Sequence, residues 1–177
     1  MNEPEVRLRP LRAGDAADVL AAFTSAADMA PQGDVTSLAA ATAYVRRLRE
    51  RHHLAFGVIF GDHVVGAVGI TVDHANRNGW LWYWLHADYR GRGWASRATA
   101  TVADWALTDG GLQRLELGHR VNNPASGRVA QAAGFVCEGL QRRKLLLNGE
   151  RIDVLSYGRL SDDPWPAYQP LPLSLPL

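Results

Sequence analysis

Cysteine is almost missing from this 177-residue sequence, in which Cys137 is the only one. A single cysteine excludes an intrachain disulfide and is typical of reducing compartments, so we expect a cytoplasmic protein. The Phe135-Val136-Cys137 context favours a buried, unreactive thiol. The six histidines lack the spacing to acidic or thiol partners that metal ligands show, so we predict no metal cofactor.

Long apolar runs and an excess of one charge are missing as well. No apolar run approaches the roughly 20 residues that span a bilayer, and the N-terminus lacks the apolar core of a signal peptide, so we expect no membrane partner. The formal net charge of +1 gives no broad electrostatic footprint for nucleic acid. The basic run Arg46, Arg47, Arg49 and Arg51 is interpreted as a solvated helix face.

What is present is a regular succession of strand-like and helix-like patterns. A chain of this length with 47% hydrophobic residues can bury the core of one domain. Apolar residues with period two predict strands, and apolar stripes at helical spacing predict helices. The predicted strands cover residues 6–9, 54–60, 64–72, 80–85, 112–117, 135–147 and 151–160. The predicted helices follow Gly14-Asp15 and cover residues 36–51, 94–108 and 124–133.

Proline is concentrated at the C-terminal end, where residues 164–177 hold five of the nine. Such a segment cannot continue a helix or a central strand. We therefore predict one domain over residues 1–161 and a Pro-rich arm over residues 162–177, either disordered or laid against the body or a neighbouring subunit. Leucine stands at Leu171, Leu173, Leu175 and Leu177, so an extended arm can present these side chains together and support a homodimer.

The most informative segment is the glycine loop, residues 90–93, between the fourth predicted strand and the helix that begins near Trp94. Glycine lets the backbone approach a ligand closely, and the first N–H groups of a helix have no internal partner. The helix dipole adds an attraction for negative charge, so we predict a diphosphate site. A dinucleotide site would need a third glycine and a first-strand position. Here the loop follows a fourth strand and the next glycine is Gly110, which disfavours that alternative.

The loop Arg90-Gly91-Arg92-Gly93-Trp94-Ala95 resembles the phosphate-binding loop of the GNAT (general N-acetyltransferase) superfamily. A second motif, Asn123-Pro124-Ala125-Ser126 followed by Gly134-Phe135 and Glu138-Gly139, is similar to the ribosomal-protein N-terminal (alanine/serine) acetyltransferase branch. Residues 8–15 and 83–86 agree with that branch, so the resemblance covers roughly residues 6–160. It implies an α+β fold in three layers. The sheet would be mixed, mostly antiparallel and seven-stranded, with splayed fourth and fifth strands and about four helices.

The resemblance also implies acetyl-CoA as co-substrate and a primary amine as acceptor. The pantetheine arm would lie between the fourth and fifth strands beside backbone groups near Leu85 and His86, one N–H of which would polarise the thioester carbonyl. Asn123 would bond to the pantetheine or cap its helix, and Ser126 would be the general acid or an ordinary helix N-terminal hydroxyl. The implied diphosphate contacts are Arg90, Gly91, Arg92, Gly93, Trp94, Ala95 and Ser96.

A carboxylate is missing from the fourth predicted strand, and Leu145 stands where the last hairpin of such acetyltransferases can place a glutamate. The remaining candidates for a general base are Glu116, Tyr83, His86 and His119, each of which can equally be a surface or packing residue. A site without a strong base suits an amine that is partly neutral. An α-amino group has a pKa near 7.7–8.0 and a lysine near 10.4, so their neutral fractions at pH 7 differ by roughly 300-fold. We therefore expect a protein or peptide N-terminus as acceptor.

Alternatives remain for both the acceptor and the activity. The acceptor can be a small amine or an amine-bearing antibiotic, because resemblance of fold does not determine substrate. The chain can also be a non-catalytic module that binds acyl-CoA, which the missing carboxylate favours. Trp80, Trp82 and Trp84 share one face of their strand and either line the acceptor pocket or pack in the core.

Overall fold

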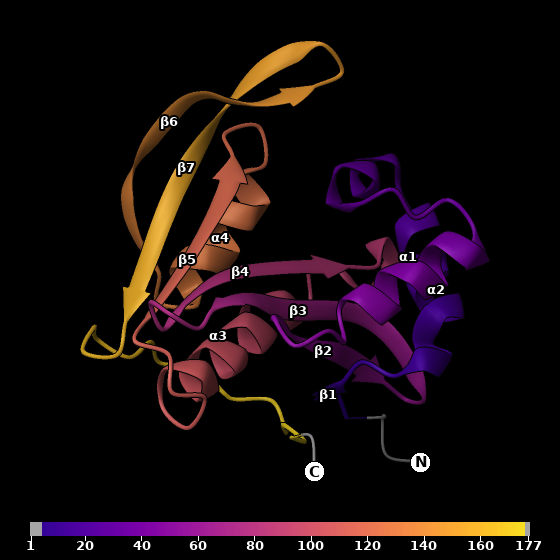
Figure 1. The fold of residues 1–177 in the computed structure, drawn as a ribbon, viewed down its shortest axis with the longest axis horizontal. Helices are drawn as coiled ribbons and strands as arrows, with labels where there is room; N and C mark the ends of the chain where they lie inside the picture. Colours follow the sequence, from indigo (N-terminus) through magenta and orange to yellow (C-terminus); the bar gives the residue numbers. More distant parts are fainter. Residues whose placement is uncertain (1–4, 176–177) are drawn as a thin grey trace.

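A seven-stranded mixed sheet forms the centre of the molecule in the computed structural model, which describes residues 5–175 (Figure 1). The strand order across the sheet is β1-β2-β3-β4-β5-β7-β6. All neighbouring strands pair antiparallel except β4 and β5, which pair parallel. The strands are β1 (Arg7–Pro10), β2 (His53–Phe60), β3 (His63–Asp73), β4 (Asn78–Leu85), β5 (Arg114–Arg120), β6 (Val136–Leu147) and β7 (Glu150–Leu160).

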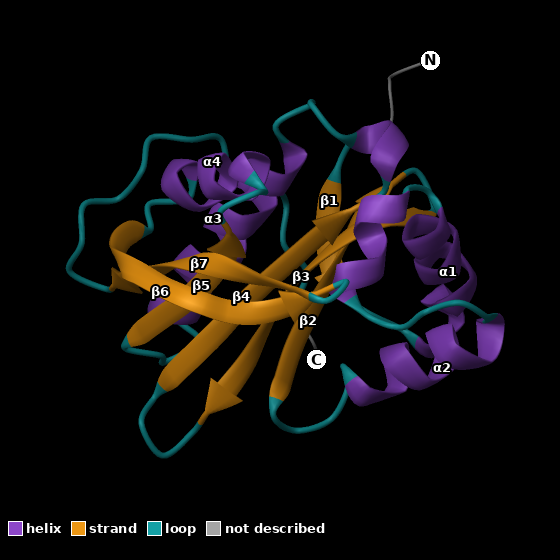
Figure 2. Cartoon of the chain, turned by 90° about the horizontal axis from the view of Figure 1, so that it is seen from above, coloured by secondary structure: helices purple, strands orange, loops and turns teal. Residues whose placement is uncertain are grey.

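Helices cover both faces of this sheet and make three layers (Figure 2). Helices α1 (Ala16–Thr24) and α2 (Leu38–Arg47) lie on one face, and α3 (Trp94–Leu107) and α4 (Pro124–Ala132) lie on the other. Successive strand residues point to opposite faces. In β3, Val68 therefore belongs to the buried cluster under α3 and α4, whereas Ala67 belongs to the cluster under α1 and α2.

The predicted α+β fold and the predicted order of seven strands and four helices are confirmed. The main differences lie at element boundaries. β5 runs three residues further than predicted, and α2 ends at Arg47 instead of residue 51. Three short 3₁₀ helices, η1 (Ala13–Asp15), η2 (Ala27–Gln32) and η3 (Ala87–Tyr89), were not predicted, because one or two turns are too short to show an apolar repeat.

The fourth and fifth strands splay apart, as predicted. Only residues 78–80 of β4 pair with residues 114–116 of β5. Beyond this point β4 continues beside β3, while β5 pairs with β7 along its whole length, from Arg114 to Arg120. The C-terminal half of β4 therefore has an open edge that faces away from β3.

The C-terminal arm lies against the body of its own chain. The Leu8 N–H donates to the carbonyl of Pro172 (2.7 Å), and Leu173 forms a short parallel bridge with Leu8 on β1. Leu171 is buried and Leu173 packs against the same core, while Leu175 is exposed. Leu171 and Leu173 therefore share one face, as predicted, but that face packs against the core of the same chain, and the prediction is wrong for the exposed Leu175. Leu177 lies outside the described residues.

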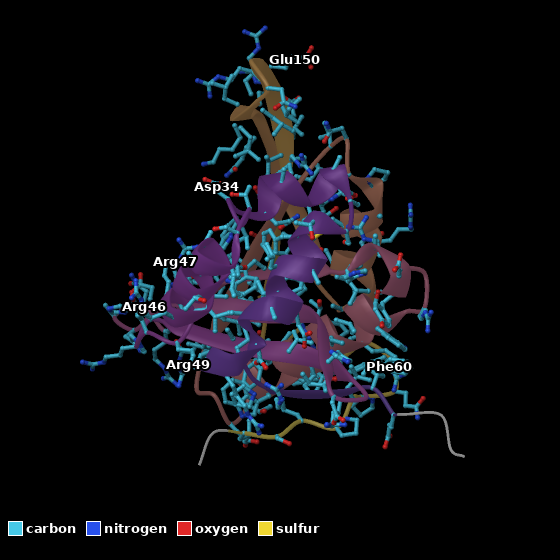
Figure 3. The ribbon with its side chains drawn as sticks, turned by 90° about the vertical axis from the view of Figure 1, so that its right-hand side faces the viewer. Asp34, Arg46, Arg47, Arg49, Phe60 and Glu150 are labelled. Atoms are coloured by element: carbon cyan, nitrogen blue, oxygen red, sulfur yellow. The ribbon has the colours of Figure 1, made fainter. Side chains whose placement is uncertain are left out.

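Three surface features complete the fold. Cys137 is exposed, so the prediction of a buried thiol is wrong; β6 is the outer strand of a hairpin that extends beyond the helices (Figure 1). The basic run is exposed as predicted, with Arg46, Arg47 and Arg49 projecting outward (Figure 3). Across residues 5–175, no helix combines the length and the apolar character that a membrane crossing requires.

Candidate active site

Two adjoining cavities open where β4 and β5 diverge. The first has a volume of about 330 Å³ and lies beside the glycine loop and the start of α3. The second has a volume of about 430 Å³ and lies between β4, β5 and the β6–β7 hairpin. Four residues line both cavities and form the boundary between them: Gln32, Tyr83, Asn123 and Ser126.

Main-chain groups at the start of α3 form one wall of the first cavity. Gly91 and Gly93 have φ of 78° and 74°, a left-handed conformation that favours glycine over residues with a Cβ. Gly93 is the N-cap of α3 and supplies no capping side chain, and the Arg97 N–H bonds back to the Gly93 carbonyl (3.1 Å). The N–H groups of residues 94–96 precede that bond and have no intrahelical partner. Gly91, Gly93, Trp94, Ala95 and Ser96 all line this cavity.

The two arginines of the glycine loop have different surroundings. Arg90 lines the first cavity, but its guanidinium bonds to both carboxylate oxygens of Asp28 on η2 (2.8 and 3.1 Å) and to the Leu85 carbonyl (3.2 Å). Arg92 is exposed outside the cavity lining, with its guanidinium 5.4 Å and 5.1 Å from the ring centres of Tyr89 and Trp94. Arg90 therefore fastens η2 to the loop, and Arg92 stacks on aromatic rings.

Sequence reasoning missed Arg128, which lines the first cavity from α4. Among the described residues, Arg128 takes part in no ion pair. Ala125 and Val129 line the same cavity, so the lining side chains recur at helical spacing. That spacing, counted from the predicted start of the helix, is the signal that could have identified Arg128. A free guanidinium here suits a phosphate.

The open edge of β4 presents Tyr83 and Leu85, not His86. The His86 N–H already donates to the Val65 carbonyl on β3 (2.8 Å). Because backbone groups alternate between the two sides of a strand, those of Leu85 and Tyr83 point to the side from which β5 has diverged. Leu85 lines the first cavity, whereas His86 is outside the linings of both. The predicted backbone contact at His86 is therefore incompatible with this geometry.

Two hydroxyl groups meet at the boundary between the cavities. The Tyr83 hydroxyl donates to the Ser126 carbonyl (2.8 Å) and lies 2.8 Å from the Ser126 Oγ. Since the Tyr83 proton is directed to the carbonyl, the Ser126 hydroxyl keeps its own proton to donate. Burial raises the pKa of Tyr83 to about 12, so Tyr83 stays protonated near neutral pH and is not a general base there. Asn123 accepts the Ser126 N–H (3.3 Å) and caps α4.

The other candidates for a general base are hydrogen-bonded elsewhere or lie outside the cavities. Glu116 lies outside both cavity linings, and its carboxylate accepts from the Arg114 guanidinium (2.7 Å). His119 lines the second cavity, but its Nδ1 donates to the Arg120 carbonyl (2.9 Å), which leaves Nε2 to accept from the Tyr157 hydroxyl (3.1 Å). His86 Nδ1 accepts the Asp88 N–H (3.2 Å). None of these side chains is available as a general base at the boundary between the two cavities.

The three tryptophans of β4 divide between the two predicted roles. Trp84 is buried and donates its indole N–H to the Tyr44 hydroxyl (3.0 Å) in the core under α1 and α2. Trp80 and Trp82 line the second cavity, and the side chain of Trp80 is 47% exposed. A Cβ on Gly69 would occupy the position of the Trp82 ring, so this glycine on β3 makes room for it.

The segment η2, which was not predicted as a helix, contributes to both cavities. Asp28, Met29 and Gln32 line the first cavity, and Pro31 and Gln32 line the second. η2 is joined to the glycine loop by the Arg90–Asp28 ion pair, and just before η2 the Ser25 hydroxyl at the end of α1 accepts the Ala87 N–H (3.0 Å). Within residues 5–175, no group of three or more His, Cys, Asp or Glu side chains is arranged to hold a metal ion.

Comparisons with known proteins agree with this geometry. A family model described as an acetyltransferase (GNAT) domain matches residues 5–136. A ribosomal-protein-serine acetyltransferase of Escherichia coli (strain K12) is 30% identical over 117 residues, which are 65% of this chain and 65% of that protein. The chain thus spans just under two thirds of the length of this curated relative.

Solved structures show the same fold. The ribosomal-protein-S5-alanine acetyltransferase from Vibrio fischeri superposes with a TM-score of 0.81 at 22% identity, covering 94% of this chain and 98% of that one. A ribosomal L7/L12 α-N-protein acetyltransferase in complex with coenzyme A gives a TM-score of 0.77 at 24% identity, covering 88% and 94% of the two chains.

Proposed function

The chain belongs to the GNAT acetyltransferase family, and on that basis we propose that it transfers an acetyl group from acetyl-CoA to a primary amine. The proposed acceptor is the α-amine of a protein or peptide N-terminus. The observation that carries the proposal is the pair of hydroxyls, Tyr83 and Ser126, at the boundary between two cavities. One cavity ends on free helix N–H groups and suits a diphosphate, and the other remains for the acceptor.

Acetyl-CoA would occupy the first cavity. The N–H groups of residues 94–96 and the close backbone of Gly91 and Gly93 would bind the diphosphate, with Arg128 adding positive charge from α4. The pantetheine arm would follow the open edge of β4 beside Tyr83 and Leu85. There the Leu85 N–H points away from β3 and would polarise the thioester carbonyl, because a fixed dipole stabilises the negative charge that develops on that oxygen.

The reaction needs one proton to reach the departing sulfur. The acceptor nitrogen attacks the acetyl carbon, the new C–N bond forms, and the C–S bond breaks to release the CoA thiolate. Ser126 would donate its hydroxyl proton to that thiolate and regain one from water, while the nitrogen of the new amide loses a proton to water. A thiol pKa near 8.5 makes this help modest.

The acceptor assignment depends on the absence, among the described residues, of a side chain that is available as a general base at the boundary. Glu116, His86 and His119 are occupied elsewhere, and the raised pKa of Tyr83 keeps it protonated. An amine must then arrive partly neutral, which favours an α-amine over lysine by roughly 300-fold in neutral fraction at pH 7. Two relatives support the same choice, because one is named as a ribosomal-protein-serine acetyltransferase and the other as an α-N-protein acetyltransferase.

Two peptides of matched sequence test the proposal at pH 7. One has a free α-amine and arginine in place of lysine, and the other has an acetylated N-terminus and one lysine. We expect the first to be acetylated with a kcat/KM at least about tenfold higher. A preference for lysine, for a polyamine or for an aminoglycoside would overturn the α-amine assignment. Thermal stabilisation by coenzyme A without turnover of any amine would instead favour a binding module that carries no catalysis.

A further inference from the structure

Charge is distributed unevenly in the second cavity. Its described lining includes Arg120 and Lys144, together with His119, and it includes no aspartate or glutamate. The remaining lining residues are apolar, aromatic or neutral polar. An acceptor entering this cavity would therefore meet fixed positive charge without a compensating carboxylate.

The positive charges are not neutralised by neighbours. Among the described residues, neither Arg120 nor Lys144 takes part in an ion pair or a side-chain hydrogen bond. Two carboxylates on the neighbouring strands have other hydrogen-bond partners: Asp153 on β7 accepts the Arg143 N–H (2.7 Å), and Glu138 on β6 pairs with Arg114, which lowers the pKa of that glutamate. Among the described residues, Arg120 and Lys144 are therefore without an ion-pair partner and can bind an anionic ligand.

The walls of the cavity strengthen that field. Trp80, Trp82, Leu117 and Val154 contribute apolar surface around the two cations. Apolar walls lower the local dielectric and focus the field of nearby charges, which attracts anions and repels cations. The indole faces of Trp80 and Trp82 can attract a cation, but a polycationic acceptor would have to approach Arg120 and Lys144 at the same time.

The lining therefore favours an acceptor that carries negative charge close to its amine. We propose that the preferred acceptor is a peptide N-terminus followed closely by acidic residues, whose carboxylates bind to Arg120 and Lys144 while the amine reaches Tyr83 and Ser126. This inference rests on the proposed acetyltransferase function and names its substrate class. It makes Arg120 and Lys144 specificity-determining residues.

Three peptides with the same first residue test the inference. They begin Ser-Asp-Glu, Ser-Asn-Gln and Ser-Lys-Arg, share all later residues, and are compared by kcat/KM at fixed acetyl-CoA. We expect the order acidic, neutral, basic, with roughly a threefold to fivefold change at each step, because an exposed ion pair contributes about 0.2–1 kcal/mol. The preference should shrink between low and high salt, since exposed charges are screened.

Substitutions then assign the preference to this cavity. The double variant Arg120→Gln, Lys144→Gln should make the three peptides nearly equal, and Lys144→Glu should improve the basic peptide relative to the acidic one. The matched control is Arg142→Gln, which removes an exposed cation on β6 that does not line either cavity. The control should keep the preference, and every variant should keep the wild-type KM for acetyl-CoA.

The possible outcomes separate this inference from the function on which it rests. Turnover of all three peptides with equal kcat/KM, or a preference for the basic one, would overturn the acidic acceptor and leave the acetyltransferase proposal standing. A preference that persists in the double variant would also overturn it. Failure to acetylate any α-amine, with coenzyme A still bound, would overturn the proposed function itself and this inference with it.

Discussion

The two cavities differ in what they are made of. The first is built around main-chain groups of residue 91 and residues 93–96, at a single strand-to-helix turn. The second is built from side chains of β4, β5, β6, β7 and η2, which are far apart in sequence (Figure 1). A group shared by a whole family, such as a diphosphate, can be held by backbone. An acceptor that varies between relatives requires side chains that vary.

This difference predicts separable effects of substitution. Changes in the glycine loop should act on acetyl-CoA, changes in the second cavity on the acceptor, and changes at the shared boundary on the chemical step.

Ser126→Ala should lower kcat by up to about 10²-fold, because positioned proton donors contribute on that order and the leaving thiol needs little help. The KM values for both substrates should change little, since Ser126 lines both cavities but fills neither. Ser161→Ala, at an exposed turn, is the control and should match wild type. Steady-state kinetics would contradict the role if kcat were unchanged.

Gly93→Val should raise the KM for acetyl-CoA by about 30-fold, since a β-branched residue at a φ of 74° costs roughly 2 kcal/mol and displaces the first amides of α3. Gly139→Val is the matched control, because a Cβ there meets no neighbouring atom and its φ is not left-handed. If Gly93→Val raised the KM for the acceptor instead of the KM for acetyl-CoA, the assignment of the first cavity to acetyl-CoA would be contradicted.

Trp80→Ala should raise the acceptor KM by about tenfold and leave the KM for acetyl-CoA unchanged, since a partly exposed indole contributes on the order of 1–2 kcal/mol of contact. Trp165, in the C-terminal arm, is exposed to the same extent (48% against 47%) and lines neither cavity. Trp165→Ala should keep both KM values. An equal effect of the two variants would show that Trp80 supports only the fold.

Arg128→Ala should raise the KM for acetyl-CoA by about threefold to fivefold, as expected for one exposed cation beside a phosphate. Arg92→Ala should have a smaller effect, because its guanidinium stacks on Tyr89 and Trp94 outside the cavity. Parallel titrations of the two variants with coenzyme A measure the contrast. A larger loss at Arg92 would mean that the loop rearranges around the cofactor.

The same difference explains how much could be predicted from the sequence. The order of elements, the splayed strands and the glycine loop are local signals, carried by period-two and helical spacing and by glycines at a turn. The predicted residues Tyr83, Leu85, Arg90, Asn123 and Ser126 also line the first cavity, because they stand at a strand end, in the loop or at a helix start.

The remaining residues needed tertiary information. η2 reaches the site through the Asp28–Arg90 ion pair, which joins segments 62 residues apart. The bond from the His86 N–H to Val65 depends on the register of β3 with β4. The exposure of Cys137 depends on the place of β6 as the outer strand of the sheet. No local pattern encodes these facts.

The central claim is that main-chain N–H groups at the start of α3 hold the diphosphate of coenzyme A. Calorimetric titration of the full chain with acetyl-CoA and with acetyl-pantetheine, which lacks the diphosphate, tests it most directly. Our account predicts one acetyl-CoA site per chain and an acetyl-pantetheine affinity weaker by more than about tenfold, or 1.4 kcal/mol. Equal affinities for the two thioesters, or no heat with acetyl-CoA, would contradict it.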